Sequence, residues 1–108
     1  MRTAGRRVIL PTGDMTTELS AEVELPQQPL IVFQATWTGV PEGTLTLECL
    51  EEDEPSQNWQ VVETVLITGA AGSEIWDIWQ TAVSRWRVHY VPDTGTGTLK
   101  VTFRGSGA

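Results

Sequence analysis

The chain has 108 residues, of which 40% are hydrophobic, and it carries a net charge of −7 with one cysteine and one histidine. This length predicts one domain, and the composition is typical of a folded globular protein. A single cysteine excludes an intramolecular disulfide and a metal site built from cysteines alone. No apolar run reaches 18 residues, and the apolar stretch near the start is too short for a signal peptide, so we expect neither a membrane span nor export by that route.

The charge is distributed unevenly along the chain. Between residues 8 and 84 there are 13 acidic residues and no lysine or arginine. An acidic body disfavours nucleic-acid binding because it repels phosphates. The basic residues form two groups, which are Arg2, Arg6 and Arg7 near the start and Arg85, Arg87, Lys100 and Arg104 near the end. The first group predicts either solvated, idle charges or a basic arm that docks on an acidic surface.

Short runs of β-branched and aromatic residues, broken by Gly, Pro and Asp, predict strands along the whole chain. In chain order the expected strands are residues 6–10, 17–25, 30–39, 44–52, 59–68, 85–91 and 98–103. The segment 75–84 stays open, because the spacing of Ile75, Ile78 and Trp79 fits a helix and the residue types fit an edge strand. We therefore predict an all-β fold, an antiparallel β-sandwich of seven to eight strands with jelly-roll or Ig-like topology. Residues 1–10 would form a basic arm and first strand, and residues 11–108 the sandwich.

Alternation of side chains within these strands predicts which residues face the core. Segment 30–39 is almost continuously apolar, which predicts a central strand. The expected inward residues are Leu45, Leu47 and Cys49 in the fourth strand, Trp86, Val88 and Tyr90 in the seventh, and Leu99, Val101 and Phe103 in the last. Arg85, Arg87 and His89 would then point outward.

Gly95-Thr96-Gly97 raises the possibility of a phosphate-binding loop. Such loops place the phosphates at the N-terminus of a helix that follows the glycines. Here a strand, residues 98–103, follows instead, and no Lys-Ser/Thr pair comes after the glycines. We therefore predict a β-hairpin at this point, with the glycines supplying positive φ angles.

The remaining chemical groups predict no catalytic, metal-binding or cofactor-binding residues. His89 has no nucleophile motif beside it and is expected to be a surface or cross-strand histidine. The acidic run 51–54 lacks the glycine of a calcium loop. Glu74 and Asp77 are the one carboxylate pair with apolar neighbours, as a glycoside hydrolase would need, and we do not expect them to act so. The chain is therefore predicted not to be an enzyme.

Five tryptophans are the most informative side chains. Trp86 is expected in the core, and Trp59 is expected to anchor the loop before its strand. Trp76 and Trp79 lie in the ambiguous segment, where they either cap one end of the core or form an aromatic surface for a sugar ring or a partner protein.

Two stretches, "FQATWTG…GTLTLECLEED…NWQVVET" and "SRWRVHYVPDTGTGTLKVTF", resemble a pattern found in small β-sandwich proteins of tailed bacteriophages. The resemblance covers roughly residues 32–103. Asp93-Thr94 precedes Gly95, where the pattern usually has a serine, and Arg104 replaces a final lysine. Proteins with this pattern are virion accessory components, such as capsid cement or decoration proteins and sometimes tail or baseplate parts. The resemblance implies a structural role and supplies no catalytic residues.

The first functional hypothesis is accordingly a capsid decoration protein of a tailed phage, which binds and stabilises the shell of the major capsid protein. We expect it on the outer capsid surface of the virion, after synthesis in the cytoplasm of the host bacterium. Its partner-binding residues would be Arg2, Arg6, Arg7, Val8, Ile9 and Leu10, acting by strand addition to a neighbouring subunit. We expect a homo-oligomer, a dimer or trimer, with no nucleic acid, membrane or cofactor involved. The alternative is a carbohydrate-binding or tail/baseplate adhesion module that uses Trp76 and Trp79.

Overall fold

The computed structural model describes residues 6–24, 30–50, 58–79 and 85–106, with residues 6–12, 30, 79 and 104–106 described by their backbone alone. No helix of the length and apolar content needed to cross a bilayer lies among these residues. The strands are β1 (Arg6–Asp14), β2 (Leu19–Glu24), β3 (Leu30–Gly39), β4 (Glu42–Leu50), β5 (Gln60–Thr68), β6 (Gly72–Trp79), β7 (Arg85–Thr94) and β8 (Gly97–Ser106).

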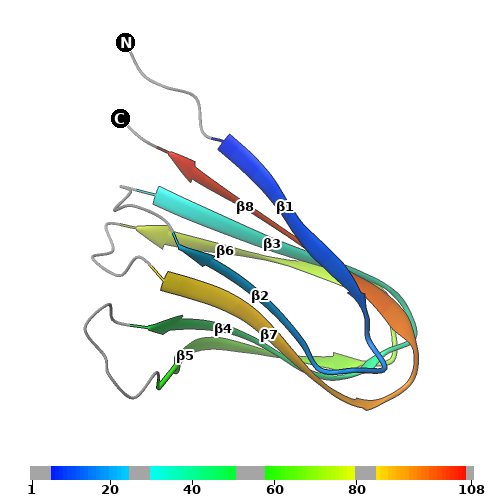
Figure 1. The fold of residues 1–108 in the computed structure, drawn as a ribbon. Helices are drawn as coiled ribbons and strands as arrows, with labels where there is room; N and C mark the ends of the chain where they lie inside the picture. Colours follow the sequence, from blue (N-terminus) through cyan, green and yellow to red (C-terminus); the bar gives the residue numbers. More distant parts are fainter. Residues whose placement is uncertain (1–5, 25–29, 51–57, 80–84, 107–108) are drawn as a thin grey trace.

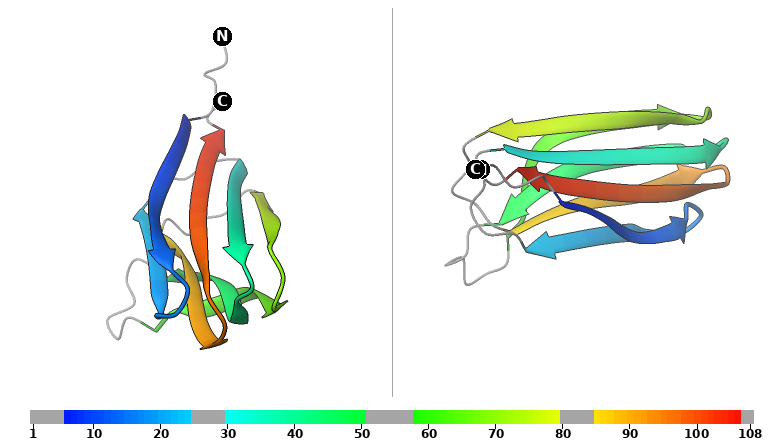
Figure 2. Two further views of the ribbon diagram at one scale, coloured as in Figure 1. Left: turned by 90° about the vertical axis from the view of Figure 1, so that its right-hand side faces the viewer. Right: turned by 90° about the horizontal axis from the view of Figure 1, so that it is seen from above.

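The eight strands form two antiparallel four-stranded sheets that pack face to face (Figure 1). The first sheet has the order β1-β8-β3-β6, which can be followed in the left view of Figure 2, and the second sheet has the order β2-β7-β4-β5. Successive strands alternate between the sheets, except for β4 and β5, which pair with each other. This is the jelly-roll arrangement, so the predicted sandwich is confirmed and the Ig-like alternative is wrong.

The ambiguous segment begins as an edge strand. β6 pairs with β3, and Trp76 lies opposite Phe33 while Ile75 lies opposite Gln34. The helix alternative is therefore wrong up to residue 79, because pairing with β3 buries alternate side chains rather than those on a helical stripe. Residues 80–84 lie outside the described part of the chain. β3 is central in its sheet, as its continuous apolar sequence predicted.

The predicted hairpin at Gly95-Thr96-Gly97 is wrong in its pairing, although it is right in being a turn. β7 and β8 belong to different sheets, so this turn carries the chain from one layer to the other. Gly95 has φ of 85°, and a Cβ on it would collide with the carbonyl oxygen of Val40. The sequence could not distinguish the two geometries, because a tight turn within a sheet and one between sheets use the same residues.

The turns at this end of the sandwich are joined by backbone hydrogen bonds. The amide of Val40, between β3 and β4, donates to the carbonyl of Thr96 over 2.8 Å, and the amide of Met15 donates to Gly97 over 2.9 Å. The amide of Gly69, after β5, donates to Pro41 over 2.8 Å. These bonds satisfy backbone groups that turns otherwise leave to solvent, and they hold the two layers in one relative position.

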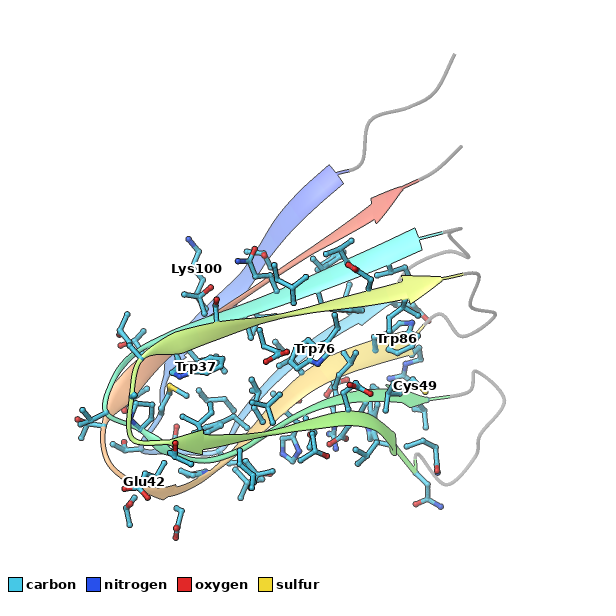
Figure 3. All side chains as sticks on the ribbon, turned by 180° about the vertical axis from the view of Figure 1, so that it is seen from behind. Trp37, Glu42, Cys49, Trp76, Trp86 and Lys100 are labelled. Carbon is cyan, nitrogen blue, oxygen red and sulfur yellow. The ribbon has the colours of Figure 1, made fainter. Side chains whose placement is uncertain are left out.

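The core lies between the layers, and its residues come from both sheets. Three tryptophans, Trp37, Trp76 and Trp86, lie between the layers in Figure 3, and the indole of Trp37 donates to the carbonyl of Ala70 over 2.9 Å. Every inward residue predicted for β7 and β8 is buried, as are Leu45 and Leu47, while Cys49 is half-buried against the core. The other large members of the core include Met15, Ile31, Phe33 and Ile67.

The first strand is part of the sandwich rather than a free arm. Arg6, Arg7, Val8, Ile9 and Leu10 pair with residues 105 to 101 of β8, and the register shifts between Leu10 and Gly13. The predicted first strand, residues 6–10, is confirmed and continues to Asp14, so the expected boundary of the sandwich at residue 11 is wrong. Residues 1–5, including Arg2, lie outside the described residues. β1 pairs with β8 on one side and is an edge of its sheet on the other.

Candidate functional site

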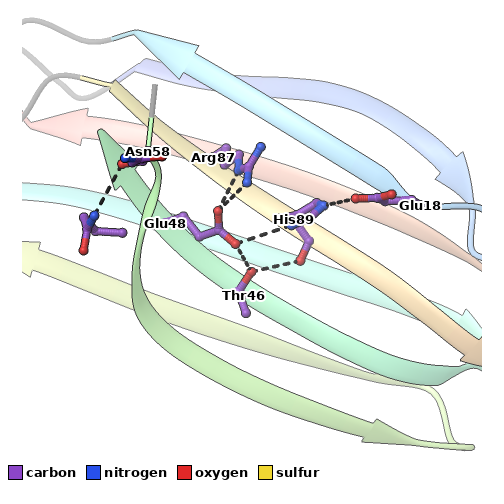
Figure 4. A network of polar contacts seen from close by, with 7 residues as sticks. Glu18, Thr46, Glu48, Asn58, Arg87 and His89 are labelled. Atoms are coloured by element: carbon purple, nitrogen blue, oxygen red, sulfur yellow. Dashed lines mark hydrogen bonds and ion pairs between the residues drawn. The ribbon is translucent and has the colours of Figure 1, made fainter. Parts of the chain in front are cut away.

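A group of polar side chains lies on the outer face of the second sheet, where the register of three strands brings them together (Figure 4). β7 lies between β2 and β4, and alternate residues of β7 point away from the core. Arg87 lies opposite both Glu22 and Glu48, and His89 lies opposite both Ser20 and Thr46. We call the residues Glu18, Thr46, Glu48, Arg87 and His89 the Glu48 cluster.

Glu48 is the centre of this cluster, and it is only 5% exposed although it lies on an outer sheet face. Arg87 donates to Oε1 of Glu48 from Nε at 2.7 Å, and its terminal nitrogen lies 2.6 Å from the same oxygen. The hydroxyl of Thr46 donates to Oε2 over 2.6 Å. Nδ1 of His89 lies 3.4 Å from Oε2. The two oxygens of Glu48 are therefore both engaged by neighbouring strand residues.

These contacts decide the charge state of Glu48. Burial by itself raises the pKa of a carboxyl group, and it is the largest single influence on Glu48. The hydrogen bonds from Thr46 and Arg87, together with electrostatic attraction to Arg87 and to His89, outweigh burial and leave the pKa of Glu48 below its ordinary value. Glu48 is therefore a carboxylate at neutral pH, and its charge is paired.

His89 joins this carboxylate to a second one. Its Nε2 contacts the carboxylate of Glu18, just before β2, while its Nδ1 faces Glu48. The backbone carbonyl of His89 also accepts a weaker bond from the hydroxyl of Thr46, at 3.4 Å. The cluster thus ties β2, β7 and β4 together by side chains, and this confirms that His89 is a cross-strand histidine.

Trp59 covers part of the same face. The guanidinium carbon of Arg87 lies 4.6 Å from the centre of the Trp59 ring, and that of Arg85 lies 5.8 Å from it. Both distances are within the range of cation–π attraction. Trp59 immediately precedes β5, so it holds the start of that strand against β7, and its predicted anchoring role is in keeping with these contacts.

The polar groups of the Glu48 cluster bind one another. The oxygens of Glu48 are occupied by donors within the cluster, and the described residues include no group of three or more His, Cys, Asp or Glu side chains placed to hold a metal ion. The carboxylate of Glu48 links β4 to β7 through side chains, in addition to the backbone pairing of the two strands.

The predicted aromatic surface is wrong for Trp76. This side chain is 5% exposed and lies between the sheets, because pairing of β6 with β3 turns it toward the core. Trp79 ends β6 opposite Leu30, and its side chain lies outside the described residues. Glu74 and Asp77 point to opposite faces of β6, since they lie opposite Ala35 and Val32, so they do not form a carboxylate pair. The acidic run 51–54 also lies outside the described residues.

Sequence reasoning missed the importance of Glu48. It predicted Arg87 and His89 on the outer face, yet their partner comes from a strand that is 39 residues away from Arg87. One available signal was the acidic residue within an apolar strand, between Leu47 and Cys49. That signal becomes specific only when β4 is known to lie beside β7.

Comparisons with known proteins give a fold and no family. No family model matches the chain, and no curated protein matches it. The prophage-derived protein YomS of SPBc2 is similar in structure, with a TM-score of 0.60 at 15% identity over 95% of this chain and 96% of that one. The mitogen of Yersinia pseudotuberculosis has a TM-score of 0.56 at 10% identity, over 90% of this chain and 85% of that one.

The K1 cleaved adhesin domain of Lys-gingipain from Porphyromonas gingivalis W83 is similar as well. Its TM-score is 0.54 at 9% identity, over 84% of this chain and 63% of that one. At these identities the likenesses establish only the fold, a small all-β sandwich. The prophage-derived protein shares this fold over nearly its whole length.

Proposed function

We propose that the chain is a structural protein of a tailed-phage virion, and in finer terms a decoration protein that binds the major capsid protein from outside the shell. The observation that carries the proposal is the fold shared end to end with a prophage-derived protein of matching length. The phage-like sequence pattern of residues 32–103 supports it independently. In this role the chain needs no catalytic activity.

The contact with the capsid is proposed at the β1 edge. β1 pairs only with β8 among the described strands, so its other edge is open to strand addition by a neighbouring subunit. Arg6 and Arg7 are the basic residues of β1, and they would pair with acidic groups on the shell. Many copies on a symmetric lattice make weak individual contacts sufficient.

The test uses particles of the phage that encodes the chain, prepared from a mutant in which the gene is deleted. We expect purified protein to co-sediment with these particles and to be seen by cryo-electron microscopy on the outside of the head. Binding to the tail or baseplate alone would move the protein to another part of the virion. Absence of binding to either would refute the virion proposal.

A charge-reversal variant tests the β1 edge. We expect Arg6→Glu combined with Arg7→Glu to lose most particle binding, while Lys100→Glu, on the exposed outer face of the same sheet, retains it (Figure 3). Both proteins should keep the wild-type thermal midpoint. Deletion of residues 1–5 leaves β1 whole, whereas deletion of residues 1–10 removes five of its residues. Only the shorter truncation therefore separates binding from folding.

A further inference from the structure

β5 is an edge strand with an unusually apolar exposed surface. Among the described strands it pairs only with β4. Leu66 is 71% exposed and Val61 is 59% exposed, and Val62 is also exposed. Large apolar side chains gathered on an open sheet edge are a known route to association with another chain.

A β-bulge explains why Val61 and Leu66, five positions apart, lie on the same outer face of the sheet. Glu48 of β4 lies opposite Val61 and Leu47 lies opposite Glu63, so Val62 is an extra residue in β5. The bulge interrupts the alternation of faces, and it leaves Glu63–Thr68 as the regular part of the strand. Leu66 lies opposite Thr44, which lies opposite the exposed Val91 of β7, so two exposed apolar side chains flank Thr44 on the outer face of this sheet.

The other three sheet edges carry charges that discourage pairing with a second copy. β2 carries Glu22 and Glu24, and β6 carries Glu74 and Asp77. β1 carries Arg6, Arg7 and Asp14. Charges on an edge strand disfavour its pairing with a second copy that carries the same charges, although a partner of opposite charge can still approach it. The regular part of β5 has one charge, Glu63, at its end.

From this contrast we infer that β5 is a self-association edge: two copies of the chain pair their β5 strands antiparallel, across a two-fold axis at Leu66, and form a continuous eight-stranded sheet. In this register Leu66 lies opposite Leu66 of the second copy, Val65 opposite Ile67, and Thr64 opposite Thr68. Every pair joins residues of like polarity.

The register is also compatible with the charges. The paired segment Thr64–Thr68 contains no ionisable side chain, and the two Glu63 residues lie at opposite ends of it. A second acidic copy can therefore approach this edge without placing like charges directly opposite each other, which would destabilise the pair. A two-fold contact of this kind closes on itself and yields a dimer rather than a filament.

The dimer does not use the proposed capsid contact. β1 lies against β2, and β2 is at the edge of the second sheet opposite to β5. The β1 edge thus stays open in the dimer. Because self-association is measured on the purified protein alone, its outcome is independent of whether the chain binds a capsid.

The first experiment measures oligomeric state by size-exclusion chromatography with light scattering over a range of concentrations. We expect a dimer for the wild-type protein. For Leu66→Asp we expect the dissociation constant of the dimer to rise by at least about tenfold. The matched control is Ile75→Asp, since Ile75 is also an apolar residue exposed on an edge strand, at 56%, but in the first sheet. This control should dimerise like the wild type, and thermal unfolding checks that both variants are folded.

The second experiment tests the register by disulfide formation in a Cys49→Ser background. Directly opposite residues in antiparallel strands have Cα atoms about 4.5 to 5.5 Å apart, which a disulfide spans. Leu66→Cys should therefore give a covalent dimer on mild oxidation. Thr64→Cys should not, because the two Thr64 residues are offset by four positions, roughly 13 Å along the strand.

Three results would overturn the inference. These are a wild-type protein that stays monomeric at all concentrations, a dimer that survives Leu66→Asp, and cross-linking through Thr64→Cys in place of Leu66→Cys. If the protein is monomeric alone and its β5 amides gain hydrogen-exchange protection only on particles, the partner of this edge is another protein and not a second copy.

Discussion

The carboxylate of Glu48 and the guanidinium of Arg87 form a charge pair that is shielded from solvent on the outside of a β-sheet. The shielding comes from Thr46, His89 and the ring of Trp59, which surround the pair. A second pair on the same face, Arg85 with Glu22, is longer at 4.0 Å, and its carboxylate is 52% exposed. Both pairs use an arginine of β7 but differ in exposure. Comparing them therefore shows how burial changes what an ion pair contributes to stability.

Removing the charge of Glu48 is expected to be costly. The variant Glu48→Gln leaves Arg87 without its carboxylate partner, and a buried charge that loses its partner destabilises the fold. We expect the free energy of unfolding to fall by about 2 kcal/mol, allowing for the partial exposure of Arg87. Urea unfolding followed by tryptophan fluorescence measures it.

The control is Glu22→Gln, for which we expect a loss below about 0.5 kcal/mol, since surface pairs contribute little. Equal losses for the two variants would show that the Glu48 cluster does not brace the sheet.

Stability is expected to decline in acid through Glu48 and Asp14. The pKa of Glu48 lies below its ordinary 4.5, and hydrogen bonds from the backbone amide and the side chain of Thr16 lower the pKa of Asp14 below 3.8. A carboxyl group whose pKa is lowered in the folded state stabilises the fold at pH values above its ordinary pKa. This contribution is lost as the pH falls through the lowered pKa. We expect a plateau near neutral pH and a decline below about pH 4.5. The decline should be shallower in Glu48→Gln, and unfolding midpoints from pH 2 to 7 test it.

The sequence was sufficient to predict which side chains face the core, but not which strands lie beside one another. Alternation placed Trp86, Val88 and Tyr90 in the core correctly, because a half-buried strand has one apolar face. It could not reveal that β7 and β8 lie in different sheets, since Gly95 serves either kind of turn. The Glu48 cluster was hidden for the same reason: which strands are neighbours is decided by contacts between distant segments.

The turn at Gly95 provides a test of that crossover. Gly95 and Gly69 both have positive φ, of 85° and 91°, but their surroundings differ. A Cβ at Gly95 meets the backbone of Val40, whereas a Cβ at Gly69 comes no closer than 3.6 Å to the side chain of Glu42. We expect Gly95→Ala to lower the free energy of unfolding by about 3 kcal/mol and Gly69→Ala by about 1 kcal/mol, the cost of the backbone conformation alone. Chemical denaturation compares them, and similar losses would contradict the tight crossing.

Tyr90 makes an unusual contribution to the core. Its side chain is fully buried, and its hydroxyl has no hydrogen-bond partner within the described part of the chain. Burial, followed by the negative charges of Asp93 and Glu42, raises the pKa of this phenol above 10.0. The fold therefore favours neutral Tyr90, and this contribution is lost as the pH rises above the ordinary value.

We expect Tyr90→Phe to leave the free energy of unfolding unchanged or to raise it by up to about 1 kcal/mol at pH 7, because no hydrogen bond is lost. The variant should also lose less stability than the wild type between pH 9 and 11. Thermal unfolding at these pH values measures both effects. A loss above about 1 kcal/mol at pH 7 would mean that the hydroxyl has a partner.

The position of β8 determines when the first sheet can form during synthesis. Among the described strands β8 follows the other seven in the chain, yet it lies between β1 and β3, so the first sheet has no continuous backbone pairing until β8 has been synthesised. Domains whose pairing joins distant segments fold slowly, since long loops must close before contacts reward them. A chain that lacked β8 would leave β1 without a neighbour in the first sheet and would expose the edge of β3, so we expect the first sheet to form only once β8 is present.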